Sequence, residues 1–229
     1  MRSILKTILT IAALCIVAVT IAQAQSLESV LGSMDKAAAN FRSAQCDFGW
    51  DQYHKVVEEH DYQNGTMYFR RQGSDVQMAA NIISPAKKQV LFTGDMLSVY
   101  EPRIDQLTQY NPGKNKADFE SYLVLGFGGS GRDLEKSFDV KFAGMEQVQN
   151  VNAAKLELTP KSQKVKGMFQ TITLWIDPAR GVSVQQKFQE PSGDYRLAKY
   201  TNIQLNPKIP GDVFKLKTSG HTKVVKPKG

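Results

Sequence analysis

The sequence has 229 residues, of which 41% are hydrophobic and 22% are charged, and its formal net charge is +7. This length suits one domain or at most two. The basic residues are scattered and have no aromatic stacking motif among them, a pattern that argues against a nucleic-acid partner.

The first 24 residues have the pattern of a secretory signal peptide. Arg2 and Lys6 form a positive start, and an almost unbroken apolar run follows over residues 8–21. The sequence AQA at positions 22–24 has small residues where signal peptidase requires them. We therefore predict cleavage after Ala24 and a periplasmic mature chain. The alternative is a retained membrane anchor, but the apolar run is shorter than the roughly 20 residues that a spanning helix needs.

Cleavage of the signal peptide would remove one of the two cysteines and keep the other in the mature chain. Cys15 lies inside the apolar run and would be removed with the signal peptide, which leaves Cys46 alone. A single cysteine forms no internal disulfide, and no neighbouring residue in the sequence suggests that a histidine or metal activates it. We predict a buried or semi-buried thiol without a chemical role.

Residues 26–43 have the period of an amphipathic helix. Ser26 can cap the helix and Glu28 favours its first turn. Apolar residues recur at helical spacing, namely Leu27, Val30, Leu31, Met34, Ala38 and Phe41. We expect this stripe to pack against the rest of the domain.

After Gln45 the apolar residues follow the two-residue period of β-strands. We predict strands within residues 65–72, 74–82, 87–92, 96–102, 105–112, 152–161, 169–178, 181–190, 195–206 and 212–218. In the eighth of these, Val184, Gln186 and Phe188 share one predicted face. Short strands at about ten-residue spacing favour an antiparallel sheet that curls into a barrel or sandwich. We predict one domain over residues 25–229, with a basic tail from about residue 215.

Residues 122–136, YLVLGFGGSGRDLEK, contain the spacing GxGxxG that binds dinucleotides in other folds. Such a site needs a strand before the glycines, a long helix after them and an acidic residue about 20 positions on. Here a short helix is favoured on both sides of the glycines. The residue 20 positions after Gly131 is Val151, which is not acidic. We predict instead a hinge between two short helices, formed by Gly126, Gly128, Gly129 and Gly131.

Catalytic and metal-binding patterns are missing from the sequence. His54, His60 and His221 do not have the spacing of metal ligands, and Ser130 does not lie in the GxSxG pattern of a nucleophile elbow. We predict no catalytic residue, no metal and no cofactor. The competing hypothesis is an enzyme acting on lipid or glycan, with carboxylates or a serine–histidine pair that only the fold brings together.

The order of these elements, and several short motifs, resemble the periplasmic outer-membrane lipoprotein carrier family (LolA-like proteins). GTMYFRRQ at 65–72 is similar to the family's Gly-x-Leu-Trp-x-x-Arg-Pro strand, and GDMLSVYEPRIDQLT at 94–108 to its Asp-Gly-x-x-Leu-Trp-x-Tyr segment. LELTPK at 156–161 is similar to the family's Leu-x-Pro-Lys strand, and residues 172–203 to its later hairpin. The sequence departs from the family pattern at Gln72 (proline in the family) and Ser98 (tryptophan).

The resemblance implies a mainly β fold with α-helices: an incomplete, half-open antiparallel β-barrel wrapped around a lid of short helices. Arg71 takes the position of the arginine that closes the lid in this family, with Arg70 as the alternative if the strand register differs by one. Inward apolar residues would line a cavity for acyl chains: Met67, Phe69, Met78, Ile82, Phe92, Leu97, Val99, Leu123, Leu125, Phe127, Leu156, Leu158, Ile172, Leu174, Ile176, Phe188 and Phe214. Sequence alone does not decide between a hollow and a filled interior.

The function that the resemblance implies is a monomeric periplasmic carrier of lipoprotein acyl chains or another lipid. Its implied partners are an inner-membrane release complex and an outer-membrane receptor. The alternative on the same scaffold is a sensor of lipid or lipoprotein that controls a membrane signalling protein. Such a regulator normally carries a second domain, for which we expect no room in this chain.

Overall fold

The computed structural model describes residues 27–73, 75–111, 113 and 125–227. The predicted signal peptide, Leu123 and most of the first predicted lid helix lie outside the described residues. In the described part of the chain, no helix combines the length and the apolar character needed to cross a membrane.

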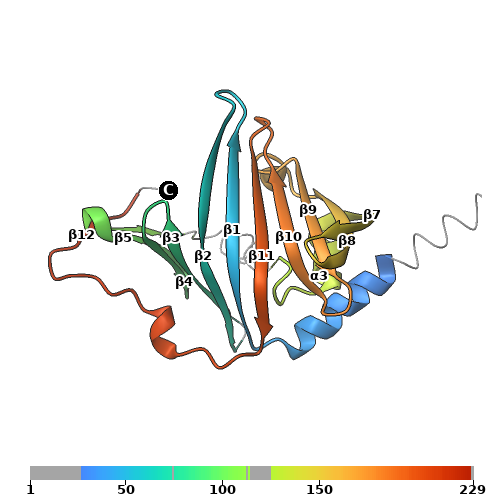
Figure 1. Cartoon of the computed structure of the whole chain (residues 1–229), viewed down its shortest axis with the longest axis horizontal. Helices are drawn as coiled ribbons and strands as arrows, with labels where there is room; N and C mark the ends of the chain where they lie inside the picture. The colour runs from blue at the N-terminus through green and yellow to red at the C-terminus, as the bar shows by residue number, and fades with distance from the viewer. Residues whose placement is uncertain (1–26, 74, 112, 114–124, 228–229) are drawn as a thin grey trace, which may run out of the picture.

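One curved sheet of 12 strands dominates the described structure (Figure 1). Its spatial order is β12-β6-β5-β4-β3-β2-β1-β11-β10-β9-β8-β7. The bounds are β1 Ser43–His54, β2 Glu59–Gln72, β3 Asp75–Ser84, β4 Lys88–Thr93, β5 Met96–Glu101, β6 Gln106–Tyr110, β7 Phe138–Val148, β8 Val151–Pro160, β9 Thr171–Asp177, β10 Val182–Gln189, β11 Tyr195–Leu205 and β12 Lys223–Val225. The sheet does not close on itself, so the predicted half-open barrel is confirmed.

Neighbouring strands are antiparallel throughout the sheet except at one edge, where β12 runs parallel to β6. The two central strands, β1 and β2, form a long hairpin that extends beyond the rest of the sheet (Figure 1). Strand β1 then pairs with β11, which joins the two halves of the sequence. The sheet thus has one half built from β2–β6 and another built from β7–β10.

Helices cover mainly the second half. The N-terminal helix, residues 27–40, and α3, Gly131–Ser137, lie against the β7–β10 half in Figure 1. A single turn, α4 (Gln163–Lys166), connects β8 to β9. The helical period predicted for residues 26–43 is correct as far as residue 40, after which the chain turns into β1.

The two halves have separate apolar clusters on the inner face, which is the concave face that carries Phe69 and Leu174. In the β7–β10 half, the helix residues Val30, Leu31 and Met34 pack onto the sheet. The sheet residues under them have no exposed surface: Ala154, Leu156, Leu158, Ile172, Leu174 and Ile176. The part of this half around β8 and β9 is therefore a filled core.

The strand predicted over residues 212–218 is wrong. The chain there forms the 3-10 turn η3, Gly211–Phe214, and Phe214 packs with Ala79 and Leu91 on the outer face of the sheet. Pro210 and Gly211 place a turn immediately before the apolar residues, and this turn chemistry overrides the short alternating pattern. The strands β1, β7 and β12 were not predicted.

The shared face predicted for Val184, Gln186 and Phe188 is also wrong at one position. The register between β9 and β10 shifts between Ser183 and Gln185, which is the mark of a β-bulge. Val184 therefore joins an outer cluster with Trp175, whereas Gln186 and Phe188 face inward.

Candidate functional site

An apolar cavity of about 380 Å³ lies on the inner face of the sheet. Its lining comes from strands on both sides of β1 and from the segment around Phe127. The lining residues are Phe48, Trp50, Met67, Phe69, Met78, Ala80, Ile82, Val90, Leu97, Leu125, Phe127, Met168, Phe169, Gln186, Phe188, Arg196, Ala198 and Tyr200. Arg196 is the one charged side chain in this set of described residues.

The strand register explains why a space is left here. Met67 lies opposite Ala80, and Ala80 lies opposite Val90 on the next strand. On the other side, Trp50 lies opposite Ala198. Because alanine carries a single methyl group, each of these rows has a small residue at its centre, and large neighbours surround a hollow instead of filling it.

Eight of the seventeen residues proposed from the sequence as cavity lining do border this cavity. They are Met67, Phe69, Met78, Ile82, Leu97, Leu125, Phe127 and Phe188. They come from the strands β2, β3, β5 and β10 and from the loop around Phe127. The fold thus brings together residues that are as far apart in the sequence as Met67 and Phe188.

The other proposed lining residues lie elsewhere. Leu156, Leu158, Ile172, Leu174 and Ile176 belong to the filled core under the N-terminal helix. Phe92 is completely buried beside the cavity, and Val99 lies opposite Val90 at its margin. Phe214 is on the outer face, and Leu123 is outside the described residues.

The side chain of Phe127 is placed against the lining of the cavity. Its ring stacks on Phe69 with 5.0 Å between the ring centroids, and it meets Tyr200 edge to face at 4.9 Å. Only 1% of Phe127 is exposed, although its backbone is in an irregular turn. An aromatic ring in this position covers apolar surface that water would otherwise contact.

Polar contacts from β10 hold the segment that carries Phe127. The backbone N–H of Ser183 donates to the carbonyl oxygen of Gly126 at 2.9 Å. The side-chain amide of Gln186 donates to the carbonyl oxygen of Leu125. Leu125 itself packs in the filled core, whereas Phe127 packs beside the cavity. Residues 125–127 therefore link the two halves of the inner face.

Arg71 contacts the same segment from the opposite side. Its Nη2 donates to the carbonyl oxygen of Gly128 at 2.9 Å, and its Nη1 donates to the carbonyl oxygen of Ala38 at 3.3 Å. The second acceptor is in the last turn of the N-terminal helix, where a cation also interacts favourably with the helix dipole. Arg71 thus joins β2, the helix and the glycine segment.

Arg70 faces the other way. Its guanidinium donates to Gln77 Oε1, at 2.6 Å from Nη2, and lies 4.2 Å from the centre of the Phe214 ring. Of the two arginines considered from the sequence, Arg71 is the one placed against the glycine segment.

The glycines of this segment allow close backbone packing. A Cβ atom on Gly126, whose φ is +76°, would lie 2.2 Å from the Cβ of Ser183. One on Gly128 (φ +88°) would lie 2.7 Å from the Phe41 ring, and one on Gly131 would lie 2.6 Å from the carbonyl oxygen of Leu31. These glycines are in tight contact in this conformation, so their predicted role as a hinge would require those contacts to separate.

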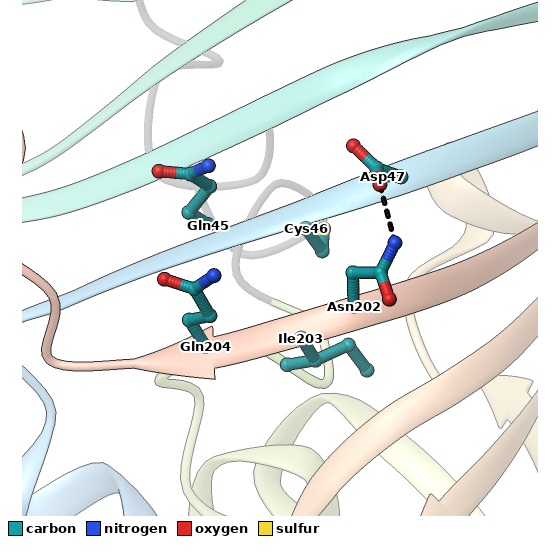
Figure 2. Close-up of a pocket in the computed structure, with 6 residues that line it drawn as sticks. All are labelled: Gln45, Cys46, Asp47, Asn202, Ile203 and Gln204. Atoms are coloured by element: carbon teal, nitrogen blue, oxygen red, sulfur yellow. Dashed lines mark hydrogen bonds between the residues drawn. The ribbon is translucent and has the colours of Figure 1, made fainter.

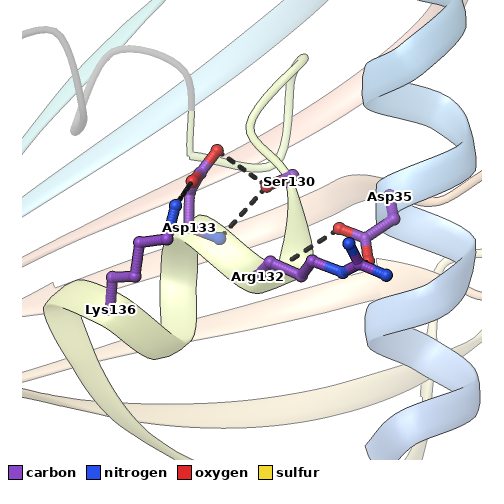
Figure 3. Close-up of polar contacts among 5 residues, drawn as sticks. All are labelled: Asp35, Ser130, Arg132, Asp133 and Lys136. Atoms are coloured by element: carbon purple, nitrogen blue, oxygen red, sulfur yellow. Dashed lines mark hydrogen bonds and ion pairs between the residues drawn. The ribbon is translucent and has the colours of Figure 1, made fainter.

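Helix α3 anchors the end of the segment to the N-terminal helix (Figure 3). Ser130 caps α3, accepting a hydrogen bond from the backbone N–H of Asp133 at 3.1 Å. Hydrogen bonds from Lys136 and then from Ser130 lower the pKa of the Asp133 carboxyl group. The backbone N–H of Arg132 donates to Asp35 Oδ1 at 3.2 Å, which ties α3 to the neighbouring helix.

Sequence reasoning missed the polar members of the cavity lining. Gln186 is 3% exposed, and its Oε1 accepts a hydrogen bond of 3.0 Å from the hydroxyl of Tyr200. Burial raises the pKa of Tyr200, so the hydroxyl keeps its proton. Arg196 lies 5.4 Å from the Trp50 ring and 3.7 Å from Glu190. A glutamine or an arginine at an inward position among apolar residues was the sequence signal that could have identified these polar lining residues.

A second hollow, of about 420 Å³, lies between β1 and β11 where their register shifts (Figure 2). It is lined by Gln45, Cys46, Asp47, Asn202, Ile203 and Gln204. Asn202 Nδ2 donates to Asp47 at 2.7 Å, so the carboxylate is already occupied by protein hydrogen bonds.

The histidines do not form a metal site with their neighbours. His60 contacts Asp51 at 2.7 Å and His54 contacts Asp61 at 3.1 Å, both on the long β1–β2 hairpin away from the cavity lining. Among the described residues, no group of three or more His, Cys, Asp or Glu side chains could hold a metal ion.

Comparison with known proteins agrees with this architecture. Residues 39–217 match the family described as "Outer membrane lipoprotein carrier protein LolA". The outer-membrane lipoprotein carrier protein of Ralstonia nicotianae (strain ATCC BAA-1114 / GMI1000) is 24% identical over 152 residues, which cover 66% of this chain and 64% of that protein. The chain thus spans just under two thirds of the length of this relative.

Solved structures show the same fold at low identity. A conserved protein from Thermus thermophilus is 14% identical, with a TM-score of 0.56 over 88% of this chain and 99% of that one. MucB is 13% identical, with a TM-score of 0.54 over 88% of this chain and 66% of MucB. In the MucA/MucB complex of Pseudomonas aeruginosa the matching chain is 15% identical, with a TM-score of 0.50 over 84% of this chain and 61% of that one.

The family match covers well over half of the sequence, and the half-open sheet is the fold expected for it. This chain belongs to the LolA family of outer membrane lipoprotein carrier proteins.

Proposed function

We propose that this protein is a periplasmic carrier that shields the acyl chains of a lipoprotein, or of another lipid, and delivers them towards the outer membrane. The observation that carries the proposal is the apolar cavity of about 380 Å³ with Phe127 held against its lining. Burial of an acyl chain is worth about 0.8 kcal/mol for each CH₂ group removed from water, and the cavity supplies the apolar surface for it.

The proposed mechanism is exchange between Phe127 and the ligand. In the arrangement described above, Phe127 covers Phe69 and Tyr200, while Arg71 and Gln186 hold the carbonyl groups on either side of it. Displacement of residues 125–128 would expose the lining to an entering chain. This displacement breaks a small number of hydrogen bonds, each worth about 1 kcal/mol net, so a bound acyl chain can offset their loss.

The compartment and the partners belong to the same proposal. A carrier between membranes requires export, in keeping with the predicted cleavage after Ala24. An inner-membrane release complex would load the protein and an outer-membrane receptor would unload it. We propose a monomer without catalysis, metal or cofactor.

Native mass spectrometry of the protein purified from its periplasm tests the proposal, with Arg71→Leu as the variant and Arg70→Leu as the matched control. Arg71→Leu removes the hydrogen bonds to Ala38 and Gly128, so the closed state should weaken and co-purified lipid or lipoprotein should be retained several-fold more. Arg70→Leu changes the outer face and should retain cargo as the natural protein does.

The carrier proposal fails if all three proteins are empty and none takes up a fluorescent acyl probe. Equal retention by the Arg71 and Arg70 variants would leave a lipid-binding cavity but remove the proposed role of Arg71.

A regulator of a membrane signalling protein is the second candidate. The observation that favours it is the fold similarity to MucB, which has been solved in a complex with MucA. A transfer assay distinguishes the two functions. A carrier passes a labelled lipoprotein from donor to acceptor liposomes, whereas a regulator retains it and binds a periplasmic segment of a membrane protein.

A further inference from the structure

We propose that Gln186 is a carbonyl-binding subsite within the cavity, which makes an acyl ester or acyl amide the preferred ligand over a simple hydrocarbon chain. In the ligand-bound state, the carbonyl oxygen of the ligand takes the place of the carbonyl oxygen of Leu125. This inference rests on the proposed carrier function and specifies the chemistry of its cargo.

Gln186 is positioned by the sheet and not by the segment that is proposed to move. It lies on β10, opposite Leu174 on β9 and Ala198 on β11, with 3% of its surface exposed. Its inward direction follows from the bulge at Ser183–Gln185. The side chain therefore stays in the cavity wall whatever residues 125–128 do.

The orientation of the Gln186 amide is set by Tyr200. A hydroxyl group with its proton donates to Oε1 of Gln186 at 3.0 Å, so the NH₂ group of the amide is directed to the other side. Burial raises the pKa of the Tyr200 hydroxyl, which keeps it a donor at physiological pH. The group presented towards Leu125 is thus a fixed hydrogen-bond donor.

Opening of the segment would take the acceptor away from that donor. Gln186 Nε2 donates to the carbonyl oxygen of Leu125, which is its acceptor among the described residues. A buried donor without an acceptor is costly in an apolar site. An ester or amide carbonyl in the ligand would satisfy it, whereas an ether or alkane would do so poorly or not at all.

The test compares two lipids that differ in one carbonyl group. Monoolein carries an acyl ester, and its ether analogue, 1-O-oleylglycerol, has the same chain and headgroup without the carbonyl. Each displaces the fluorescent probe N-phenyl-1-naphthylamine from the mature protein, which gives two apparent affinities. We expect the natural protein to bind the ester about fivefold more tightly, the value of one net hydrogen bond.

Two variants assign this preference to the residue. Gln186→Leu should bring the ester-to-ether ratio to about one. Gln185→Leu makes the same substitution at the adjacent residue, which faces away from the cavity opposite Lys199, and should keep the fivefold ratio. Because the ratio is compared within each protein, a general loosening of the segment in Gln186→Leu does not imitate the effect. Tyr200→Phe removes the hydroxyl group that fixes the Gln186 amide, so its ester-to-ether ratio should lie between one and five. This variant replaces Gln186→Leu in the test if Gln186→Leu does not fold.

The outcomes separate this inference from the carrier proposal. If both lipids bind the natural protein equally, or if the preference persists in Gln186→Leu, the subsite is refuted and the carrier proposal stands. If neither lipid nor the probe binds, the carrier proposal and the subsite fall together.

Discussion

The two halves of the sheet have the same sequence pattern and different interiors. In the β7–β10 half the inward residues of β8 and β9 are fully buried, because Val30, Leu31 and Met34 of the N-terminal helix pack onto this part of the sheet. In the β2–β5 half the inward residues face a cavity, and several, including Met67 and Leu97, remain partly exposed. Alternating apolar residues produce a buried face in one half and a face that borders a cavity in the other.

Whether an inner face is filled or hollow depends on the element that covers it. Both inner faces carry Leu, Ile, Phe or Met at alternate positions, so composition does not separate them. The N-terminal helix, residues 27–40, covers one half. Among the described residues, the other half is covered by the ring of Phe127 and a few neighbouring side chains.

The largest effect should come from matched truncations in the two halves. Leu174→Ala, in the filled half, should lower the free energy of unfolding by about 3–5 kcal/mol, because a cavity is created in close-packed surroundings. Leu97→Ala, beside the existing cavity, should cost less than about 2 kcal/mol, because little additional empty space is created. Urea unfolding followed by circular dichroism measures both.

Equal losses for the two substitutions would contradict the distinction between a filled half and a hollow half. A change in the denaturant slope would instead indicate an altered unfolded state and require a second probe of unfolding.

A smaller effect is expected at the junction between the halves. Gly126→Ala should cost roughly 2–4 kcal/mol, because a left-handed φ of +76° and a clash with Ser183 act together. Gly94→Ala is the matched control, with a φ of +60° and no atom within 4 Å of the added Cβ, and should cost about 1–2 kcal/mol. Thermal unfolding reports the difference.

Gly126→Ala should also increase uptake of an acyl probe, since it separates the Leu125 carbonyl from Gln186. Unchanged uptake, with the expected loss of stability, would show that the segment moves as one body and keeps the cavity covered.

The finest test of the comparison, which leaves stability unchanged at pH 8, involves Cys46, the one cysteine among the described residues. Cys46 is buried in the hollow half, and burial followed by the nearby charge of Asp47 raises its pKa to about 12. At pH 8 a thiol reagent should therefore modify Cys46 at least about a thousandfold more slowly in the folded protein than in urea. Absorbance of the released chromophore gives both rates.

The sign of the pH dependence follows from the same shift. The unfolded thiol, with a pKa near 9.0, loses its proton before the folded one, so stability falls as the pH rises from about 9 to about 12. A cysteine placed in the filled half, Ala154→Cys with Cys46→Ser, should react more slowly still. Faster reaction there would mean that the filled half opens more readily than the hollow one.

Much of the architecture could be predicted from local pattern. The alternation in residues 65–72 and 195–206, together with turn residues between strands, predicts an antiparallel sheet, and the 3.6-residue period predicts the first helix. The inward direction of Arg71 follows from its sharing a face with Met67 and Phe69. Its role in closing the lid stays a prediction.

What could not be predicted depends on positions that only the assembled sheet determines. The bulge at Ser183–Gln185 turns the side chain of Val184 to the outer face and leaves that of Gln186 on the inner face. No residue in the local sequence predicts this bulge. Leu156 and Leu97 have the same inward pattern, and only the distance to the N-terminal helix separates core from cavity. Phe214 was misplaced because turn chemistry competes with a strand-like pattern over a few residues.

The ends of the sheet have a consequence for association between copies of the protein. At one edge, β7 carries a register shift between Phe142 and Met145 at Gly144, together with Lys141 and Glu146, and so presents an irregular, charged ladder. At the other edge, β12 is three residues long and lies parallel on β6, anchored by Asp105 through Ser219 and Thr222. Such edges disfavour the addition of a strand from another molecule, and so we expect a concentrated solution of this protein to resist fibre formation and strand exchange.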